Sequence, residues 1–289
     1  MKNKNNLSEN SNILISNPKR LQKVKEKFIQ DGLKKIHILA DFEKTLTKAR
    51  VDGRETSLIS VLRDGDYLNA DYRKQAHTLY KHYRPIEKDL KISKQNRRSA
   101  MLEWWTKHFK LLIDSGLSKK DIQSVVSESG TQFRENTLEF IDLLHNNKIP
   151  LVIMSAGGLG EAIPMLLKQE KRLYENVYII ANSFKWDKSG KAIDYKLPII
   201  HAANKDETLI RDFPEINKAV QGRQNVILLG DGLGDVGMVD GFDYRNLIKI
   251  GFLNDDSTEA RESFQKHFDI VLTSDISMEY PHNLIREIT

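Results

Sequence analysis

Cysteine is absent from all 289 residues of the chain. This absence excludes disulfide bridges, thiolate metal ligands and a cysteine nucleophile, and it is compatible with a reducing compartment. The chain also lacks any apolar run near the roughly 18 residues that a membrane-spanning helix needs. Its first residues, "MKNKNNLSENSN", contain no apolar stretch typical of a secretory signal. We therefore expect a cytoplasmic protein that has no membrane partner.

A long block of one charge sign is also missing. The 45 Lys and Arg residues are interleaved with 40 Asp and Glu residues, which leaves a formal net charge of +5. Such mixing is typical of a solvated surface, and the sequence contains neither a nucleic-acid motif nor a dense basic stripe. We therefore expect no polymeric nucleic acid as a partner, although a mildly positive surface would attract small phosphorylated anions.

The hydrophobic residues, which make up 39% of the chain, form short continuous runs separated by helical patterns. Continuous runs are typical of parallel strands that are buried on both faces of a sheet. Strand–helix alternation then predicts an α/β fold with a Rossmann-like parallel sheet core. The predicted strands are 35–41, 149–156, 177–182, 225–231, 247–253 and 269–273, and a hairpin with its turn at 187–190 interrupts the alternation.

The long segment between the first two predicted strands differs from the rest of the chain in composition and hydrophobic pattern. Residues 65–145 are mostly helix-like and rich in Lys, Glu, Leu, Tyr and His, and the segment is too long for a loop. We interpret residues 51–145 as a helical cap domain inserted into an α/β catalytic core, which 13–50 and 146–289 form. Residues 1–12 are rich in Asn, Ser and Lys, and we expect them to be a disordered tail.

Polar side chains suited to phosphate chemistry follow several predicted strands, and ligands of open α/β sheets bind at the carboxyl ends of strands. Gathered carboxylates repel one another unless they share a cation, and oxygen-only ligands favour Mg²⁺. Taken singly, each of these residues is more often a turn, a helix cap or a surface residue, and their order along the chain is what favours a site. They are Asp41 at the end of the first strand with Glu43 and Thr45 just beyond, Ser155 at the end of the second followed by Ala156 and Gly157, then Lys205, and finally Asp231 and Asp235.

The order of these residues resembles the haloacid dehalogenase superfamily of phosphatases. Its Asp-x-Asp-x-Thr motif corresponds to residues 41–45, and its strand-end hydroxyl, lysine and Gly-Asp motifs correspond to Ser155, Lys205 and 230–235. The stretches "DFEKTLTK", "EWWTK", "IMSAGG", "NKDE", "ILLGDGLGD" and "KIGFLND" further resemble the cytosolic 5′-nucleotidase type III family, also called pyrimidine 5′-nucleotidases. The likeness runs from about Ile13 to the end of the chain.

This resemblance implies phosphoester hydrolysis in two displacements. Asp41 would attack phosphorus and form an aspartyl-phosphate, and Glu43 would protonate the leaving ribose oxygen and later deprotonate water. Mg²⁺ would be held by Asp41, the backbone carbonyl of Glu43, and Asp231. The resemblance also implies roles for other residues: Ser155, Ala156, Gly157 and Lys205 would bind phosphate, Lys205 would also act in catalysis, and Asp235 and Thr45 would support the site.

Position 43 departs from the family pattern, which normally has Asp there. The additional methylene of Glu43 lengthens the side chain by roughly 1.5 Å, one C–C bond. A misplacement of that order can cost about 10²-fold in rate. We therefore expect reduced or retuned catalysis, and the alternative is a catalytically impaired relative that still binds nucleotides.

The cap should recognise the base. In the resembled family a glutamate early in the cap and a serine 21 residues later contact the base; here Glu87 matches the glutamate, and His108 replaces the serine. A carboxylate can accept a hydrogen bond from a pyrimidine amino group and also suits the cationic ring of 7-methylguanine. His108 could stack on or hydrogen-bond a base, or it could be a plain surface or core histidine. For Trp104 and Trp105, packing in the cap core is the favoured interpretation.

These observations predict a Mg²⁺-dependent 5′-nucleotidase that acts on nucleoside 5′-monophosphates. Pyrimidine monophosphates are the first substrate candidates and 7-methyl-GMP is the second. The alternatives are a phosphatase or phosphotransferase for another small phosphoester, or the impaired relative described above. The sequence leaves the oligomeric state open, with a monomer favoured.

Overall fold

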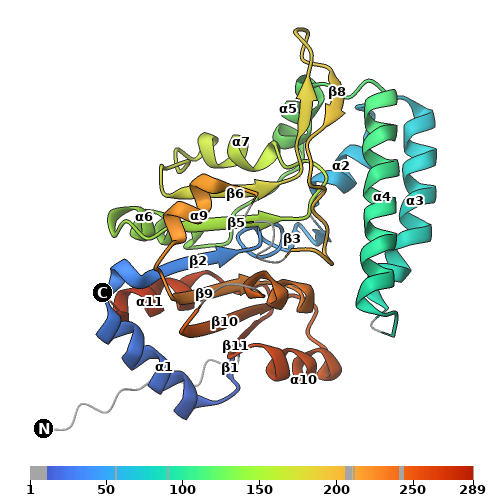
Figure 1. Cartoon of the computed structure of the whole chain (residues 1–289). Coiled ribbons are helices and arrows are strands. Elements are labelled where there is room, and N and C mark those ends of the chain that lie inside the picture. Colours follow the sequence, from blue (N-terminus) through green and yellow to red (C-terminus); the bar gives the residue numbers. More distant parts are fainter. Residues whose placement is uncertain are drawn as a thin grey trace, which may run out of the picture.

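The computed structural model describes residues 12–55, 57–89, 91–205, 210, 212–240 and 244–288. Within these residues the main feature is a seven-stranded sheet with the strand order β1-β11-β10-β9-β2-β5-β6 (Figure 1). Every neighbouring pair is parallel except β1 and β11. The strands are β1 (Ile13–Ile15), β2 (Ile36–Ala40), β5 (Leu151–Ser155), β6 (Val177–Ala181), β9 (Asn225–Gly230), β10 (Asn246–Leu253) and β11 (Ile270–Thr273).

The central strands form where the sequence has its continuous apolar runs. All residues of β2, β5 and β9 are buried, so both faces of the sheet are covered, and the predicted parallel core is confirmed. The antiparallel strand β1 was not predicted, because it is short and only half-buried at one edge. The expected disordered tail at 1–12 lies outside the described residues, apart from residue 12.

Helices cover the two faces of the sheet. Alternate residues of a strand point to opposite faces, so that Ile38 packs with one helical layer and Leu39 with the other. The first layer contains α1 (Pro18–Asp31), α6 (Thr137–Asn146), α7 (Ala162–Gln169) and α11 (Glu279–Ile288), and the second contains α9 (Pro214–Val220) and α10 (Thr258–His267). None of the described helices combines the length and apolar character required to cross a bilayer.

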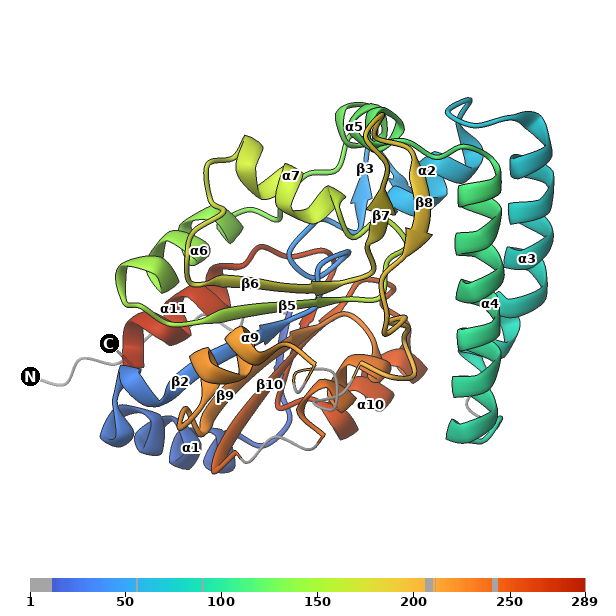
Figure 2. The same cartoon turned by 45° about the horizontal axis from the view of Figure 1, so that its top comes forward.

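The segment after β2 is mostly helical, as predicted. Its helices are α2 (Leu58–Asp64), α3 (Ala70–Lys88), α4 (Lys94–Asp114) and α5 (Lys119–Glu128). Helices α3 and α4 pack along each other and stand to one side of the sheet in both views (Figures 1 and 2). Helix α5 packs on α7, and α6 packs on α11. The assignment of 51–145 to a cap domain stays a prediction, and its last helix lies on the core.

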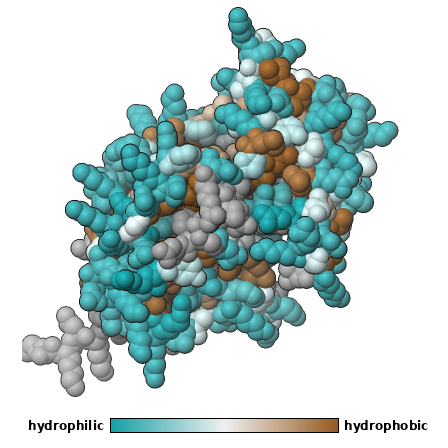
Figure 3. Space-filling view, in the orientation of Figure 1, coloured by the Kyte–Doolittle hydropathy of each residue, from teal (hydrophilic) through white to brown (hydrophobic). Residues whose placement is uncertain are grey.

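Two small hairpins complete the fold. The first, β3 (Arg50–Val51) and β4 (Arg54–Glu55), was not predicted, because its arms are two residues long. The second, β7 (Phe184–Trp186) and β8 (Ala192–Tyr195), confirms the prediction of a hairpin there. Figure 3 shows a largely polar face, with apolar residues gathered around this second hairpin and beside α4.

Candidate active site

Asp41 lies directly after β2, and its carboxylate is bound by a lysine from a distant part of the chain. The Lys205 ammonium group donates to Asp41 Oδ1 at 2.5 Å and to Asp235 Oδ1 at 2.7 Å. All three side chains are buried. One cation therefore bridges the predicted nucleophile and an acid that follows β9, as expected for residues at the carboxyl edge of a parallel sheet.

The turn after β9 fixes the position of Asp235. Its Oδ2 atom accepts hydrogen bonds from the backbone amides of Asp231 at 3.1 Å and Gly232 at 2.9 Å. Gly230 permits this close approach, because a Cβ atom there would lie 2.5 Å from the Asp235 Cβ. The "GDGLGD" stretch thus aims one carboxylate at Lys205 and leaves Asp231 beside it.

Asp41, Asp231 and Asp235 form an acidic cluster that could hold a metal ion. Each offers one oxygen, and these atoms lie within 4.8 Å of one another. Burial raises the pKa of Asp41 to about 7, and Asp235 and Glu43 add to this effect while Lys205 opposes it. Burial and the neighbouring carboxylates also raise the pKa of Asp231 well above its usual range. Three carboxylates face one ammonium group, and a divalent cation would cancel the excess negative charge.

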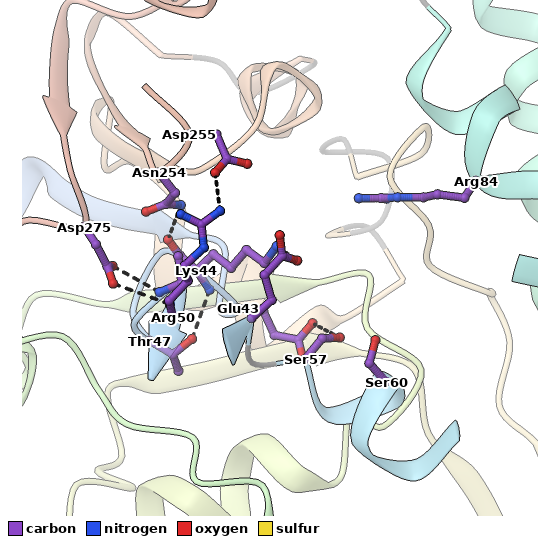
Figure 4. Close-up of polar contacts among 12 residues, drawn as sticks. Glu43, Lys44, Thr47, Arg50, Ser57, Ser60, Arg84, Asn254, Asp255 and Asp275 are labelled. Atoms are coloured by element: carbon purple, nitrogen blue, oxygen red, sulfur yellow. Dashed lines mark hydrogen bonds and ion pairs between the residues drawn. The ribbon is translucent and has the colours of Figure 1, made fainter. Parts of the chain in front are cut away.

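Glu43 lies two residues beyond Asp41, and its carboxylate is held at the start of α2. Its Oε1 atom accepts a hydrogen bond from the Leu58 amide at 2.8 Å, and Oε2 accepts one from the Ser57 hydroxyl at 3.3 Å (Figure 4). Burial raises the pKa of Glu43, and the hydrogen bond from Leu58 offsets only part of that rise. This environment favours the protonated form that a general acid needs.

The loop after β5 lies against the Glu43 carboxylate. Ser155 is buried at the strand end, and its hydroxyl oxygen accepts a hydrogen bond from the Gly157 amide at 3.2 Å. A Cβ atom on Gly157 would lie 3.9 Å from Glu43 Oε2, and one on Gly158 would lie 2.6 Å from the Trp105 ring. The loop that carries the phosphate-binding candidates therefore lies near the acid at Gly157 and near α4 at Gly158.

Asn182 ties this loop to the segment that leads to Lys205. Its side-chain amide donates to the carbonyl oxygens of Gly157 at 3.1 Å and Ile200 at 2.8 Å. Further along, Asn204 accepts a hydrogen bond from the His201 amide at 2.7 Å. Neither asparagine was predicted as a site residue, because each acts on backbone atoms that only the fold brings within reach.

Arg134 is a further residue that sequence reasoning missed. Its buried guanidinium donates from Nε to the Thr45 carbonyl oxygen at 2.8 Å and from Nη2 to the Lys44 carbonyl oxygen. It also donates to Asn254 Oδ1 at 2.6 Å and to Asp275 Oδ1 at 2.6 Å. The backbone that follows the nucleophile is thus held by loops after β10 and β11, and an arginine in a sequence without a motif gave no signal of this role.

Thr45 is buried in the same loop. Its Oγ1 atom has no hydrogen-bond partner among the described residues. The carbonyl oxygen of the preceding residue, Lys44, which accepts from Arg134, also accepts a hydrogen bond from the Asn254 side-chain amide at 3.1 Å. Asn254 lies in the quoted stretch "KIGFLND", which is where the sequence held a signal for it.

The two predicted base-binding residues lie on different helices of the segment after β2. Glu87, on α3, forms an ion pair with Arg84 one turn earlier. His108, on α4, is buried, stacks on Trp105 with ring centroids 5.7 Å apart, and lies 3.2 Å from the Tyr72 hydroxyl. Burial, with a smaller contribution from a nearby arginine, lowers the pKa of His108 to about 4. This packing is that of a neutral core histidine, and a contact of either residue with a base stays a prediction.

The two tryptophans pack in the interior, as favoured from the sequence. Trp104 stacks on Tyr83 with centroids 5.8 Å apart, in a small cluster that also contacts Ala203, two residues before Lys205. Trp105 packs on Gly158. Two cavities, of about 630 Å³ and 670 Å³, lie beside α4 and beside α6, and neither is lined by Asp41, Glu43 or Lys205.

The fold is that of the haloacid dehalogenase class of phosphatases. A phosphoserine phosphatase solved with its substrate has the same fold, with a TM-score of 0.54, 18% identity, and coverage of 88% of this chain and 98% of that one. The model of the family "Pyrimidine 5′-nucleotidase (UMPH-1)" matches residues 44–289, and the chain belongs to this family. The resemblance inferred from the sequence is confirmed, and the protein is a phosphoric monoester hydrolase of the 5′-nucleotidase type.

Individual relatives cover nearly the whole chain. The 7-methylguanosine phosphate-specific 5′-nucleotidase of Gallus gallus is 32% identical over 282 residues, which are 97% of each protein. The Homo sapiens protein with the same description is 32% identical over 96% of this chain and 92% of its own. The crystal structure of cytosolic 5′-nucleotidase IIIB bound to cytidine has a TM-score of 0.89 and 29% identity, with coverage of 97% of this chain and 94% of that one.

Proposed function

We propose that the chain is a Mg²⁺-dependent 5′-nucleotidase that hydrolyses nucleoside 5′-monophosphates through an aspartyl-phosphate on Asp41. Pyrimidine monophosphates are the first candidates and 7-methyl-GMP is the second. The observation that carries the proposal is the buried Lys205 ammonium group, which binds both Asp41 and Asp235 beside Asp231. This arrangement places a nucleophile, a cation and an acidic cluster at one edge of the sheet.

The donor set at this edge suits Mg²⁺, because it consists of carboxylate oxygens with excess negative charge. Asp41, Asp231 and the backbone carbonyl of Glu43 would hold the ion. When bound, it would offset the negative charge of the phosphate and of the acidic cluster. Asp235 would support the ion site without binding the ion directly, because its two oxygens already bind Lys205 and backbone amides.

In the first displacement, an Asp41 oxygen forms a bond to phosphorus while the bond from phosphorus to the ribose 5′-oxygen breaks. Glu43 donates its proton to that leaving oxygen. Lys205 holds the attacking carboxylate, and the Ser155 hydroxyl with the amides of 156 and 157 orients the phosphate oxygens. In the second displacement, Glu43 accepts a proton from the water that attacks phosphorus, which releases inorganic phosphate and restores Asp41.

The cap would contact the nucleoside through Glu87 and His108. The relatives described as 7-methylguanosine phosphate-specific and the cytidine-bound structure support a nucleotide as the substrate. A Caenorhabditis elegans relative described as "Putative cytosolic 5′-nucleotidase 3" supports a cytosolic location. A monomer is our working oligomeric state. The impaired-relative alternative is less favoured, because the Glu43 carboxylate is bonded into the site and faces the loop at Gly157.

Phosphate release from CMP, UMP, 7-methyl-GMP and the purine monophosphates, each with Mg²⁺ and with a chelator, tests this proposal. We expect turnover of at least one nucleotide with Mg²⁺ and none with the chelator. The Asp41→Asn variant, which keeps the shape of the nucleophile, should reduce release to the level of the chelated enzyme. If no nucleotide is hydrolysed while Mg²⁺ still binds, the chain is the impaired relative. If other small phosphoesters are far better substrates, the nucleotidase assignment fails.

A further inference from the structure

Arg84 is a cap residue that the mechanism does not use, and it is bound to the predicted base-recognition residue. Its Nη1 atom donates to Glu87 Oε2, one turn further along α3. The Glu87 side chain is only 18% exposed, whereas the Arg84 side chain is 39% exposed. The carboxylate that would meet a base is therefore already paired with a cation of the same helix.

The side chain of Arg84 extends toward the active site. Figure 4 shows it projecting from α3 toward the side that holds Glu43 and Lys44. The Lys44 ammonium group donates to the Glu55 carboxylate at 2.9 Å. The negative charge of that carboxylate also helps to raise the pKa of the Arg84 guanidinium. Burial would lower the pKa of the Arg84 guanidinium, but Glu87, and to a smaller extent Tyr80 and Glu55, raise it overall.

The alternative interpretation is an ordinary ion pair within a helix. Oppositely charged residues three positions apart often form such pairs, which contribute little to stability when they are exposed. Two observations distinguish this pair. The Glu87 side chain is only 18% exposed, and the Arg84 side chain projects from α3 toward the side of the molecule that holds Glu43 and Lys44 (Figure 4). The permanent positive charge of Arg84 in this position changes the electrostatic energy of any base that approaches Glu87.

We infer that Arg84 is a specificity-determining residue, which neutralises Glu87 and so selects neutral bases over the cationic 7-methylguanine. An unpaired carboxylate in a partly buried site attracts a cationic ring, whereas a guanidinium bound to that carboxylate repels it. The remaining N–H groups of Arg84 can donate to the keto oxygen of cytosine or uracil. This inference rests on the proposed function, because it takes Glu87 as the residue that meets the base.

The test compares kcat/KM for CMP and 7-methyl-GMP in the wild type and in Arg84→Gln, Arg84→Lys and Arg73→Gln. The wild type should favour CMP, and Arg84→Gln should raise the ratio of 7-methyl-GMP to CMP by at least about tenfold. Arg84→Lys keeps the charge and should stay close to the wild type. Arg73, near the start of α3, pairs with the exposed Asp66 in the loop before that helix, so Arg73→Gln is the matched control and should leave the ratio unchanged.

A second series shows whether the effect passes through Glu87. In a Glu87→Gln background, Arg84→Gln should no longer change the ratio, because the carboxylate that it exposes is gone. An unchanged ratio in Arg84→Gln, or a wild type that prefers 7-methyl-GMP, would overturn the inference. If no nucleotide is hydrolysed, the proposed function fails, and the same ratio measured as Kd for cytidine and 7-methylguanosine still decides the role of Arg84.

Discussion

Glu43 is the residue at which the chain departs from the Asp-x-Asp-x-Thr pattern, and the structure gives the longer side chain a defined place. Its carboxylate reaches the Leu58 amide and the Ser57 hydroxyl at the start of α2. The added methylene is used to make these contacts, and the carboxylate still faces the loop at Gly157. The sequence alone predicted either reduced or retuned catalysis or a catalytically impaired relative. These contacts favour retuned catalysis, with Glu43 still in a position to serve as the general acid.

Shortening Glu43 should therefore lower activity. In Glu43→Asp the carboxylate would retreat from Leu58, and we expect kcat to fall, by up to about 10²-fold. Glu43→Gln keeps the length but can neither donate nor accept the proton, so its loss should be roughly 10²- to 10⁴-fold. Steady-state rates with the best nucleotide substrate provide the measurement. A higher kcat in Glu43→Asp would show instead that the glutamate impairs the natural enzyme.

At the scale of elements, Arg134 connects the loop after β2 with the segment before α6 and the loops after β10 and β11. Its five hydrogen bonds reach the carbonyl oxygens of Lys44, Thr45 and Ile276 and the side chains of Asn254 and Asp275. A planar guanidinium can satisfy this fork of acceptors, whereas a lysine cannot. Arg134 is therefore a positioning residue for the loop that carries Asp41 and Glu43.

Replacing Arg134 with lysine should distinguish an effect on the position of the loop that carries Asp41 and Glu43 from an effect on nucleotide binding. We expect Arg134→Lys to lower kcat at least about tenfold with a much smaller change in KM, because the catalytic loop shifts while the nucleoside contacts on the cap remain. Arg134→Ala should also reduce the free energy of unfolding by roughly 3 kcal/mol, since Asp275 and buried carbonyl oxygens lose their partner. Steady-state kinetics and urea unfolding measure these effects.

Arg172 provides the matched control, because it forms a similar two-armed pair with Asp142 on the partly exposed surface of the core. Arg172→Lys should leave kcat and KM unchanged and should alter stability by less than about 1 kcal/mol. A loss of stability in Arg134→Lys with unaltered kcat would mean that Arg134 is purely structural.

These contacts also show which elements can be predicted from the sequence. Strands β2, β5 and β9 were predictable, because a long apolar run specifies burial on both faces of a sheet without knowledge of its neighbours. Strand β1 and the β3–β4 hairpin are too short to produce a periodic pattern. The role of Arg134 depends on Thr45, which lies 89 positions earlier, and no local pattern encodes such a contact.

At the scale of the whole molecule, the same reasoning explains why the candidate site residues were predictable as a set. Asp41 and Asp231 each follow a strand and Ser155 ends one, and a parallel sheet brings such positions to one edge. No such rule applies to the predicted cap, because the positions of Glu87 and His108 depend on how α3 and α4 pack. His108 accordingly lies in the interior, between Tyr72 and Trp105.

Buried histidines such as His108 should make the folded chain sensitive to acid. Burial lowers the pKa of His108 to about 4, and burial likewise lowers the pKa of His37 to about 4. In the unfolded chain a histidine titrates near 6.5, so between these values the unfolded state binds more protons than the folded state. Each histidine therefore contributes stability that is complete above about pH 6.5 and is lost as the pH falls toward 4.

Asp41, whose pKa is raised to about 7, acts in the opposite sense, because its folded form binds the proton more tightly than its unfolded form. The stability of the wild type alone therefore cannot isolate the histidines, and variants must be compared. Relative to the wild type, His108→Gln should lose less stability on acidification from pH 6.5 to 4.5, by up to roughly 1.4 kcal/mol per pH unit. Urea unfolding at several pH values measures this slope, and exposed His82→Gln is the control that should follow the wild type. Parallel curves for the wild type and His108→Gln would mean that His108 can take up a proton while the chain stays folded.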